Sequence, residues 1–372
     1  MAKNSNLSQA KAAKNDEFYT QYADIQKEVN AYIEYNPDVF RDKTILLPCD
    51  DPEWSNFTKF FAQNFEFFGL KKLISTSYAI ESKNYKSDWQ PTLFETENPL
   101  YNADKSRVKG KIFTLDHDTN TNGRIDIDDL QWHYLEGDGD FRSAEVTALR
   151  DEADIIITNP PFSLFREFLA WIMDSEKQFL IIGSMNSITY KEVFPLVKDN
   201  QMWLGNGFSA GNAFFRIIGG ASTDYADGVY DVNTGLVKFR NCCWFTNIDH
   251  GRRHQPLQLM TMADNLKFNK KLKGQTEYYH YDNYDAIEVP YTELIPSDYL
   301  GMMAVPITFL DRYCPEQFEI LGITQRNDDP YKIKKYTIAE YANANDLNAR
   351  GVIIIDGKPR SMYARVLIRK KQ

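Results

Sequence analysis

The residues best suited to chemistry lie between Asp154 and Phe162. The stretch reads Asp-Ile-Ile-Ile-Thr-Asn-Pro-Pro-Phe, so a β-branched run ends in Asn159, Pro160, Pro161 and Phe162. Proline lacks a backbone N–H and disfavours helical geometry in the preceding residue, so Asn159 and Pro160 are expected to be extended, with their oxygens pointing outward. The Asn159 side-chain oxygen and the Pro160 carbonyl can then accept both hydrogens of an exocyclic amine, which makes its nitrogen nucleophilic. Phe162 can stack on the ring that carries the amine.

The flanking residues predict the elements that position this tetrapeptide. The apolar run before it is typical of a strand, and the spacing after Ser163 predicts an amphipathic helix with Ser163 as its N-cap. Asn-Pro dipeptides also mark ordinary turns, so a rigid strand-to-helix corner without a ligand is the alternative interpretation.

Strand-like and helix-like segments alternate through the first two thirds of the chain. Strands are expected at 44–47, 72–78, 112–115, 154–158, 179–183, 213–218 and 236–246, and helices at 55–68 and 191–198. This alternation predicts an α/β fold with a doubly wound, mainly parallel sheet and a late antiparallel strand. Ligands of such sheets bind beyond the carboxyl ends of the strands.

Three regions follow from this pattern. Residues 1–14 are polar and without periodicity, and we expect a mobile N-terminal arm there. Residues 15–255 carry the alternating pattern and form the expected catalytic domain. Residues 256–372 are tyrosine-rich and irregular, with strand-like runs only near the end, and form an expected loop-rich, β-containing recognition appendage.

Composition limits the function classes. The 372 residues suffice for a large core, and no apolar stretch has the length of a signal peptide or a membrane span, so a cytoplasmic protein with no membrane partner is expected. The four cysteines lack metal-ligand spacing. The net charge is −9, but basic residues cluster in the second half, where they could follow a phosphate backbone; ordinary solvated faces are the alternative.

Two further pairs could bind a ligand that faces the amine. Asp50 and Asp51 come directly after the first expected strand, although either could instead cap the following helix. Asp140 could accept a hydrogen bond from an adenine amino group, and Phe141 could pack against the adenine ring.

Several segments together resemble one enzyme family, the EcoRI-type adenine-specific DNA methyltransferases of the gamma group of amino-methyltransferases. The resemblance rests on Lys14–Thr20, Cys49–Pro52 with Ser55–Phe57, Gly139–Ser143, Asn159–Glu167, Ile182–Gly183 with Asn186–Glu192, and Trp244–Asn247. It implies a Rossmann-like methyltransferase sheet and S-adenosylmethionine as cofactor.

The resemblance also implies roles for individual residues. Phe18, Tyr19 and Thr20 would contact the methionine end of the cofactor, and Asp50 and Asp51 would form the first cofactor motif. Asp140 and Phe141 would bind the adenine of the cofactor. The catalytic residues would be Asn159, Pro160, Pro161 and Phe162, with Asn159 also bordering the cofactor. Two departures stand out. The first motif reads Asp-Asp-Pro-Glu-Trp-Ser instead of a Gly-rich turn, and the second strand ends in Ser75, Thr76 and Ser77 instead of an acidic ribose ligand.

The expected reaction is methyl transfer to N6 of a flipped-out adenine in double-stranded DNA, by a monomer, within a restriction-modification pair with a cognate endonuclease or by an orphan enzyme. Flipping costs a few kcal/mol, which base–aromatic stacking can offset. Phe162 is the first candidate for stacking, followed by Trp203, Phe208, Phe214, Trp244 and Phe245, for which core packing is favoured. An RNA-adenine or protein-glutamine methyltransferase is the nearest alternative.

A second signal is an EF-hand-like loop at 116–129. Its expected calcium ligands are Asp118, Asn120, Asn122, Arg124, Asp126 and Asp129, with Gly123 at the turn. A metal here would be structural, and a metal-free loop built from the same turn formers is the alternative. The loop also allows a non-catalytic, calcium-stabilised binding module as a different class of function.

Overall fold

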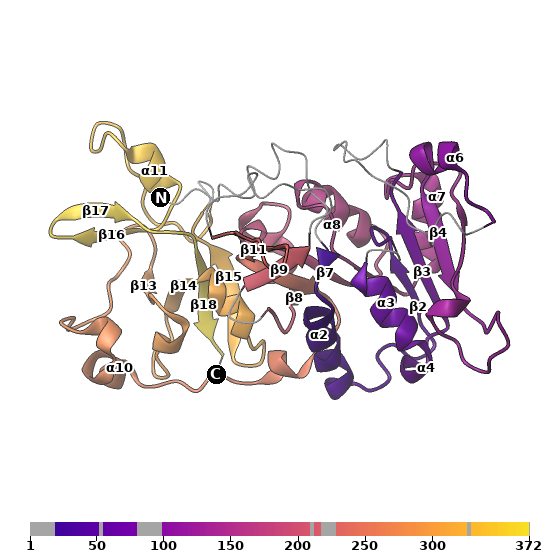
Figure 1. The fold of residues 1–372 in the computed structure, drawn as a ribbon. Helices are drawn as coiled ribbons and strands as arrows, with labels where there is room; N and C mark the ends of the chain where they lie inside the picture. Colours follow the sequence, from indigo (N-terminus) through magenta and orange to yellow (C-terminus); the bar gives the residue numbers. More distant parts are fainter. Residues whose placement is uncertain are drawn as a thin grey trace. The chain divides into compact units, whose positions relative to one another are not determined.

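The chain divides into two compact units in the computed structural model (Figure 1). The structure describes residues 19–51, 55–79, 99–208, 212–216, 228–325 and 329–371. The first unit comprises the described residues of Met1–Ser184 and Leu204–His250, and the second those of Met185–Trp203 and Gly251–Gln372. A single cut after residue 255 was expected, whereas the segment 185–203 belongs with the later part of the chain.

An eight-stranded sheet is the framework of the first unit. Its order is β5 (Gln131–Tyr134), β4 (Lys111–Leu115), β3 (Lys72–Ser77), β2 (Thr44–Leu47), β6 (Ile155–Thr158), β7 (Gln178–Ser184), β12 (Cys242–Thr246) and β8 (Trp203–Leu204). Strands β3, β2, β6 and β7 are parallel, with Leu46 opposite both Ile74 and Ile156. Every residue of β2 and β6 is buried, as expected for parallel strands covered on both faces.

The expectation of an α/β fold is confirmed, but the sheet is more mixed than predicted. Strand β4 is antiparallel to both β3 and β5, and β12 is antiparallel to β7. The parallel arrangement is therefore limited to the four central strands, whose carboxyl ends share one edge of the sheet.

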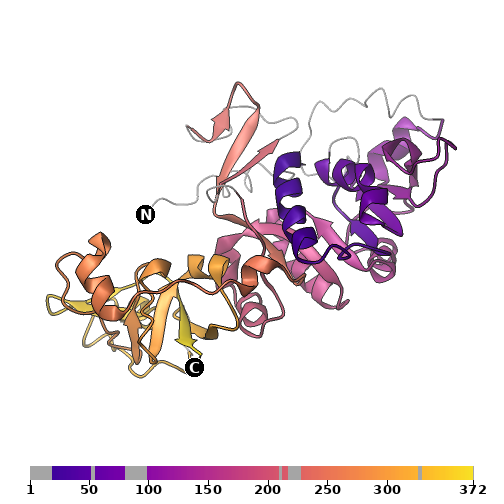
Figure 2. The same cartoon turned by 90° about the horizontal axis from the view of Figure 1, so that it is seen from below.

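Helices and a second sheet complete the first unit. The helices are α2 (Tyr22–Tyr35), α3 (Asn56–Gln63), α4 (Phe65–Phe68), α6 (Ala103–Val108), α7 (Ala144–Glu152) and α8 (Phe165–Met173). The small sheet has the order β1 (Tyr19–Thr20), β9 (Asn212–Arg216), β11 (Leu236–Arg240) and β10 (Tyr230–Asp231). Figure 2 shows the salmon strands of this small sheet beside the indigo helix α2. One hydrophobic core joins α2, α3, the central sheet and the inner face of the small sheet.

The prediction of a single strand at 236–246 is wrong, because the structure has two strands there. Residue Asn241 adopts a left-handed backbone with φ of 61°, a conformation that asparagine tolerates better than most residues. The chain turns at this point from β11 in the small sheet into β12 in the central sheet. One residue thus connects the two sheets of the unit.

The second unit has a sheet of its own. Its order is β13 (Ala286–Glu288), β14 (Met302–Pro306), β18 (Arg365–Lys370) and β15 (Phe318–Ile323), and a hairpin joins β16 (Val352–Ile355) to β17 (Lys358–Ser361). Short helices α9 (Phe194–Lys198), α10 (Met262–Phe268) and α11 (Ala344–Asn348) accompany them. The hairpin turns at Asp356 and Gly357, both with positive φ, which is the backbone geometry that Asp-Gly turns favour. Among the described residues of the whole chain, no helix has the length and apolar character needed to cross a bilayer.

Candidate functional site

The carboxylate of Asp50 connects the ends of two parallel strands to the start of a helix. It follows β2 and is 5% exposed. The Ser55 hydroxyl donates to Oδ1 at 2.6 Å, and the Thr158 hydroxyl at the end of β6 donates to Oδ2 at 2.6 Å. Ser55 is also the N-cap of α3, accepting from Phe57 N at 3.0 Å. The predicted acidic residue therefore lies directly beside the strand that leads into the Asn-Pro-Pro-Phe motif.

Hydroxyl groups at the end of β3 hold the backbone around Asp50. The Ser75 hydroxyl donates to the Asp50 carbonyl, and Thr58 Oγ1 lies 3.2 Å from the same oxygen. Thr76 Oγ1 donates to Pro48 O at 2.9 Å, and Asp50 N donates to Thr76 O at 2.9 Å. The sequence has Ser75 and Thr76 at the end of β3, where the family pattern has an acidic residue. In this structure their hydroxyl groups hydrogen-bond to the end of the neighbouring strand β2.

The N-terminal segment reaches the same region through the small sheet. Thr20 pairs with Phe215 of β9, and its carbonyl accepts from Asn56 Nδ2 of α3 at 2.7 Å. Thr20 is 2% exposed, and its hydroxyl has no hydrogen-bond partner among the described residues. Tyr19 is half-buried, whereas Phe18 lies outside the described residues. A buried hydroxyl near the Asp50 cluster fits a polar ligand.

The Asn-Pro-Pro-Phe motif forms the corner that the sequence predicted. Asn159 is half-buried and Pro160 is buried at the end of β6, and Leu164 N donates to Pro161 O at 3.0 Å to close a single helical turn. The prediction of Ser163 as N-cap is wrong: a short 3₁₀ turn occupies 162–164, and α8 begins at Phe165 with Leu164 at its N-cap position. The prolines delay the α-helix by one turn.

Phe162 contacts the inner face of the small sheet. Its ring centroid is 6.2 Å from that of Phe215 and 6.0 Å from that of Phe239. Phe215 and Phe239 are diagonal neighbours on paired strands, with their ring centroids 5.5 Å apart. The small sheet therefore positions the aromatic residue of the motif.

Asp140 lies in a polar environment and Phe141 in an apolar one. The carboxylate of Asp140 accepts from Arg142 Nη2 at 2.6 Å, Arg142 Nε at 2.9 Å, Arg142 N at 2.8 Å and the Tyr78 hydroxyl at 3.2 Å. The guanidinium of Arg142 holds the pKa of Asp140 below its usual range, and burial raises the pKa of Tyr78. A ligand amino group would have to replace one of these four donors.

Phe141 lies in the core. Its ring contacts Phe168 and Trp171 of α8 edge-on, with centroids 5.0 and 5.6 Å apart. Of the other aromatic candidates, Phe208, Trp244 and Phe245 are also buried, as the core interpretation predicted, whereas Phe214 is 40% exposed. Only the last of these can contact a large partner from the surface without a rearrangement.

The loop at 116–129 hydrogen-bonds to itself. The Asp129 carboxylate accepts from Thr119 N, Thr119 Oγ1, Asn120 N and Asp126 N, and these bonds lower its pKa although burial opposes them. Asp118, Asn120, Asn122 and Asp126 each accept from a backbone N–H of the loop, and Arg124 N is one of these donors. Within the described ranges no three His, Cys, Asp or Glu side chains gather as metal ligands. The structure gives the calcium prediction no support.

Polar side chains gather at the carboxyl ends of the parallel strands. This arrangement is typical of α/β enzymes that bind their ligands at this edge of the sheet. The model of the family described as "Adenine-specific methyltransferase EcoRI" matches residues 6–371. The chain therefore belongs to this family and is an enzyme of the adenine-specific methyltransferase type.

Curated relatives agree with this assignment. The type II methyltransferase M.EcoRI of Escherichia coli is 40% identical over 88% of this chain and 92% of its own length. M.MpnI of Mycoplasma pneumoniae is 31% identical over 98% of both chains, and M.MgeORF184P of Mycoplasma genitalium is 33% identical over 98% of this chain and 99% of its own length. No solved structure gives a significant match.

Proposed function

We propose that this protein transfers a methyl group from S-adenosylmethionine to N6 of a flipped-out adenine in double-stranded DNA, at a specific sequence. The observation that carries the proposal is the position of Asn159-Pro160-Pro161-Phe162, which begins one residue after Thr158, itself bonded to Asp50. A donor held beside the Asp50–Asp51 turn and an amine held at Asn159 would meet at adjacent strand ends. Membership in an adenine-specific methyltransferase family supports the choice of donor and acceptor.

The chain has residues that suit the donor. S-adenosylmethionine, when bound, supplies an electrophilic methyl group on a sulfonium. The half-buried Asp51 and the buried Thr20 hydroxyl would contact the polar methionine end, while Asp50 keeps the strand ends in register. Asp140 would receive the cofactor's adenine at its edge, and Phe141 would support the pocket from the core side.

Asn159 and Pro160 would orient the target amine. Their two oxygen acceptors fix both N–H groups and leave the nitrogen lone pair directed at the methyl carbon. No general base is required, because the proton leaves after the nitrogen has attacked. Phe162, supported by Phe215 and Phe239, would stack on the extruded base and supply about 1–3 kcal/mol toward the cost of flipping.

The proposal extends to partners. The enzyme would act as a monomer in the cytoplasm, either beside a cognate restriction endonuclease for the same site or as an orphan, with base recognition contributed by the second unit. An RNA-adenine or protein-glutamine substrate is the competing assignment, since the same acceptors fit any planar amine or amide.

Replacement of Asn159 by Ala tests the assignment. With labelled S-adenosylmethionine and duplex DNA, the wild type should label adenine N6, and Asn159→Ala should lower transfer at least about 100-fold while cofactor affinity stays within a few fold, since one oriented polar group is worth about 3 kcal/mol or more. The control is Asn247→Ala, which removes an amide that bonds Phe179 N and Lys177 O at the start of β7. That variant should lose stability but keep transfer per folded molecule.

Two outcomes would contradict the proposal. Full activity of Asn159→Ala would remove the catalytic assignment, and label found in RNA or protein but absent from DNA would favour the competing substrate classes.

A further inference from the structure

The small sheet presents a basic and aromatic outer face. Residues directly opposite on paired antiparallel strands point to the same side, and Phe214 is opposite Lys238, Arg216 opposite Leu236, and Asn212 opposite Arg240. The residues between them, Ala213, Phe215, Val237 and Phe239, are buried on the other side. Phe214, Arg216 and Arg240 are exposed and Lys238 is half-buried, so the outer face is open to a partner.

The positive charges of this face are not neutralised within the described part of the chain. Arg216, Lys238 and Arg240 make no ion pair there, and the ammonium of Lys238 lies 5.8 Å from the centre of the Phe214 ring. The only carboxylate in the described strands of the sheet, Asp231, accepts from Asn233 N at its own turn. Three cations without a carboxylate partner among the described residues contrast with the net charge of −9 of the whole chain.

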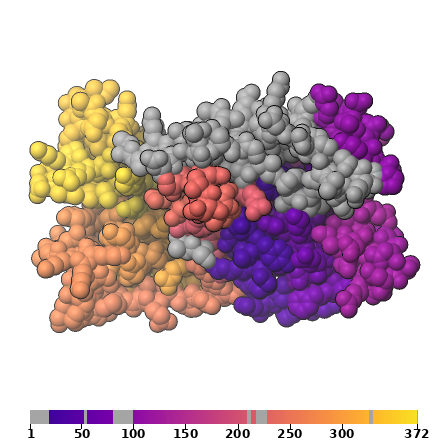
Figure 3. Space-filling view, in the orientation of Figure 1, coloured from indigo at the N-terminus to yellow at the C-terminus, as the bar shows by residue number. Residues whose placement is uncertain are grey.

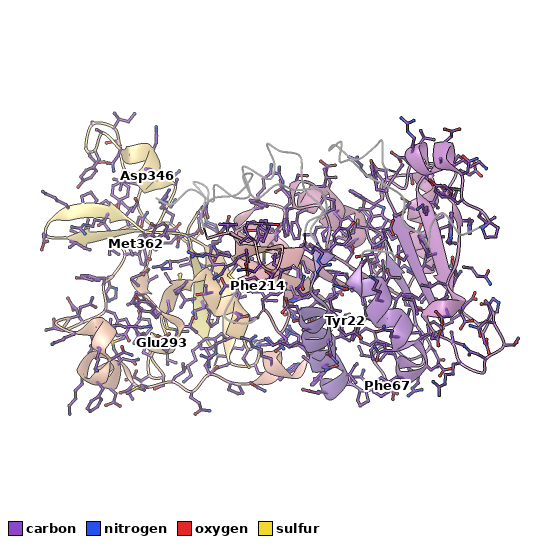
Figure 4. The ribbon with its side chains drawn as sticks, in the orientation of Figure 1. Tyr22, Phe67, Phe214, Glu293, Asp346 and Met362 are labelled. Atoms are coloured by element: carbon purple, nitrogen blue, oxygen red, sulfur yellow. The ribbon has the colours of Figure 1, made fainter. Side chains whose placement is uncertain are left out.

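The opposite face of the same small sheet contacts Phe162 of the proposed catalytic motif. Phe215 and Phe239, whose rings contact Phe162, alternate along β9 and β11 with Phe214, Arg216, Lys238 and Arg240. A partner on the outer face is therefore separated from Phe162 by the thickness of one sheet. The exposed strands lie at the surface in Figure 3, and Figure 4 labels Phe214 on them.

We propose that this outer face binds the phosphate backbone of duplex DNA close to the methylated adenine. Arg216, Lys238 and Arg240 contact phosphates, and Phe214 packs against the sugar or base between them. Cations beside an exposed ring suit a polyanion that carries apolar sugars and bases, whereas a second copy of the same face would bring cations against cations. This inference rests on the proposed function and names the surface by which the substrate is held.

The salt dependence of DNA binding tests the inference. The variant Arg216→Gln/Lys238→Gln/Arg240→Gln should bind duplex DNA more weakly, and the slope of log affinity against log salt should fall by about 0.9 for each lost phosphate contact. Its cofactor affinity and far-ultraviolet circular dichroism should be unchanged. The charge-preserving variant Arg216→Lys/Arg240→Lys should keep the wild-type slope.

A matched control removes three exposed cations elsewhere in the first unit. Lys71→Gln/Lys105→Gln/Arg107→Gln changes the net charge equally but lies outside the small sheet, so its slope should stay near that of the wild type. Phe214→Ala should weaken binding with little change in slope, because stacking does not release counterions.

The outcomes separate this inference from the proposed function. Equal slopes for the triple variant and the wild type, with methylation of adenine intact, would overturn the inference and leave the function standing. Failure of the wild type to methylate duplex DNA would overturn the function. If the triple variant lowered the salt slope for duplex RNA but not for duplex DNA, the surface would also be rejected as a DNA site.

Discussion

A single buried carboxylate organises the candidate site. Asp50 accepts hydroxyl hydrogens from Ser55 and Thr158 on two different elements, while its backbone bonds to Thr76. A buried acceptor with good partners adds little net stability, but a mismatched one costs its full desolvation. The site therefore depends on the two acceptor oxygens and the shape of this side chain.

Replacement of Asp50 by Asn should destabilise the protein by about 1–3 kcal/mol, because an amide NH2 would face a hydroxyl that now donates to the carboxylate. Urea unfolding at neutral pH measures the change. The neighbouring half-buried Asp51→Asn is the control and should change stability by less than about 1 kcal/mol. Equal losses in the two variants would show that position in the loop, rather than the bonds of Asp50, sets the effect.

The sequence alone picked out the candidate residues but not their bonding partners. Asn159 and Asp50 stood out because each follows an apolar strand, which is a local signal. The contacts of Asp50 with Thr158 and Ser75 depend on the order β3, β2, β6 in the sheet, which no local pattern specifies. The loop at 116–129 is the opposite case. Its motif was visible in the sequence, but in the structure its carboxylates accept hydrogen bonds from backbone N–H groups of the same loop.

At the scale of elements, the small sheet supports the candidate site through its inner aromatic residues. Phe215 is fully buried and contacts Phe162 and Phe239, while its neighbour Phe214 points to the other side. The sequence predicted both strands as apolar runs but merged β11 with β12. The break is encoded in one left-handed asparagine, which an apolar pattern does not reveal.

Phe215→Ala should lower the free energy of unfolding by about 3–5 kcal/mol, because it removes a buried ring and leaves a cavity behind Phe162. Methyl transfer per folded molecule should fall as well. Denaturant titration with a parallel transfer assay measures both effects. Phe214→Ala, one residue away on the exposed face, is the stability control and should change unfolding by no more than about 0.5 kcal/mol. A similar loss in both variants would contradict the assignment of inner and outer faces.

At the scale of the whole molecule, each unit has its own interior. In the second unit, the guanidinium of Arg365 donates to the buried carboxylate of Glu288 at 2.7 and 3.0 Å, and the Tyr281 hydroxyl donates to the same group. These residues belong to strands β13 and β18 or lie just before them. The first unit has its core around the parallel strands.

Glu288→Gln should destabilise the second unit by about 3–5 kcal/mol, because it leaves a buried guanidinium without its charge partner. Hydrogen exchange should then accelerate in β13, β14 and β18 but not in β2 and β6. The exposed pair of Lys271 and Glu293 offers the control, since both side chains are almost half exposed. Glu293→Gln should cost less than about 1 kcal/mol. Uniform acceleration throughout the chain would mean that the two units unfold as one.

The path of the chain has a consequence for biosynthesis. After β7 the polypeptide contributes residues 185–203 to the second unit, returns for 204–250, and only then leaves for good. On the ribosome, the outer edge of β7 stays open until β12 emerges nearly sixty residues later, so the nascent first unit carries one exposed strand edge for several seconds at ordinary elongation rates. Neither unit can therefore be expressed as one continuous fragment of the chain.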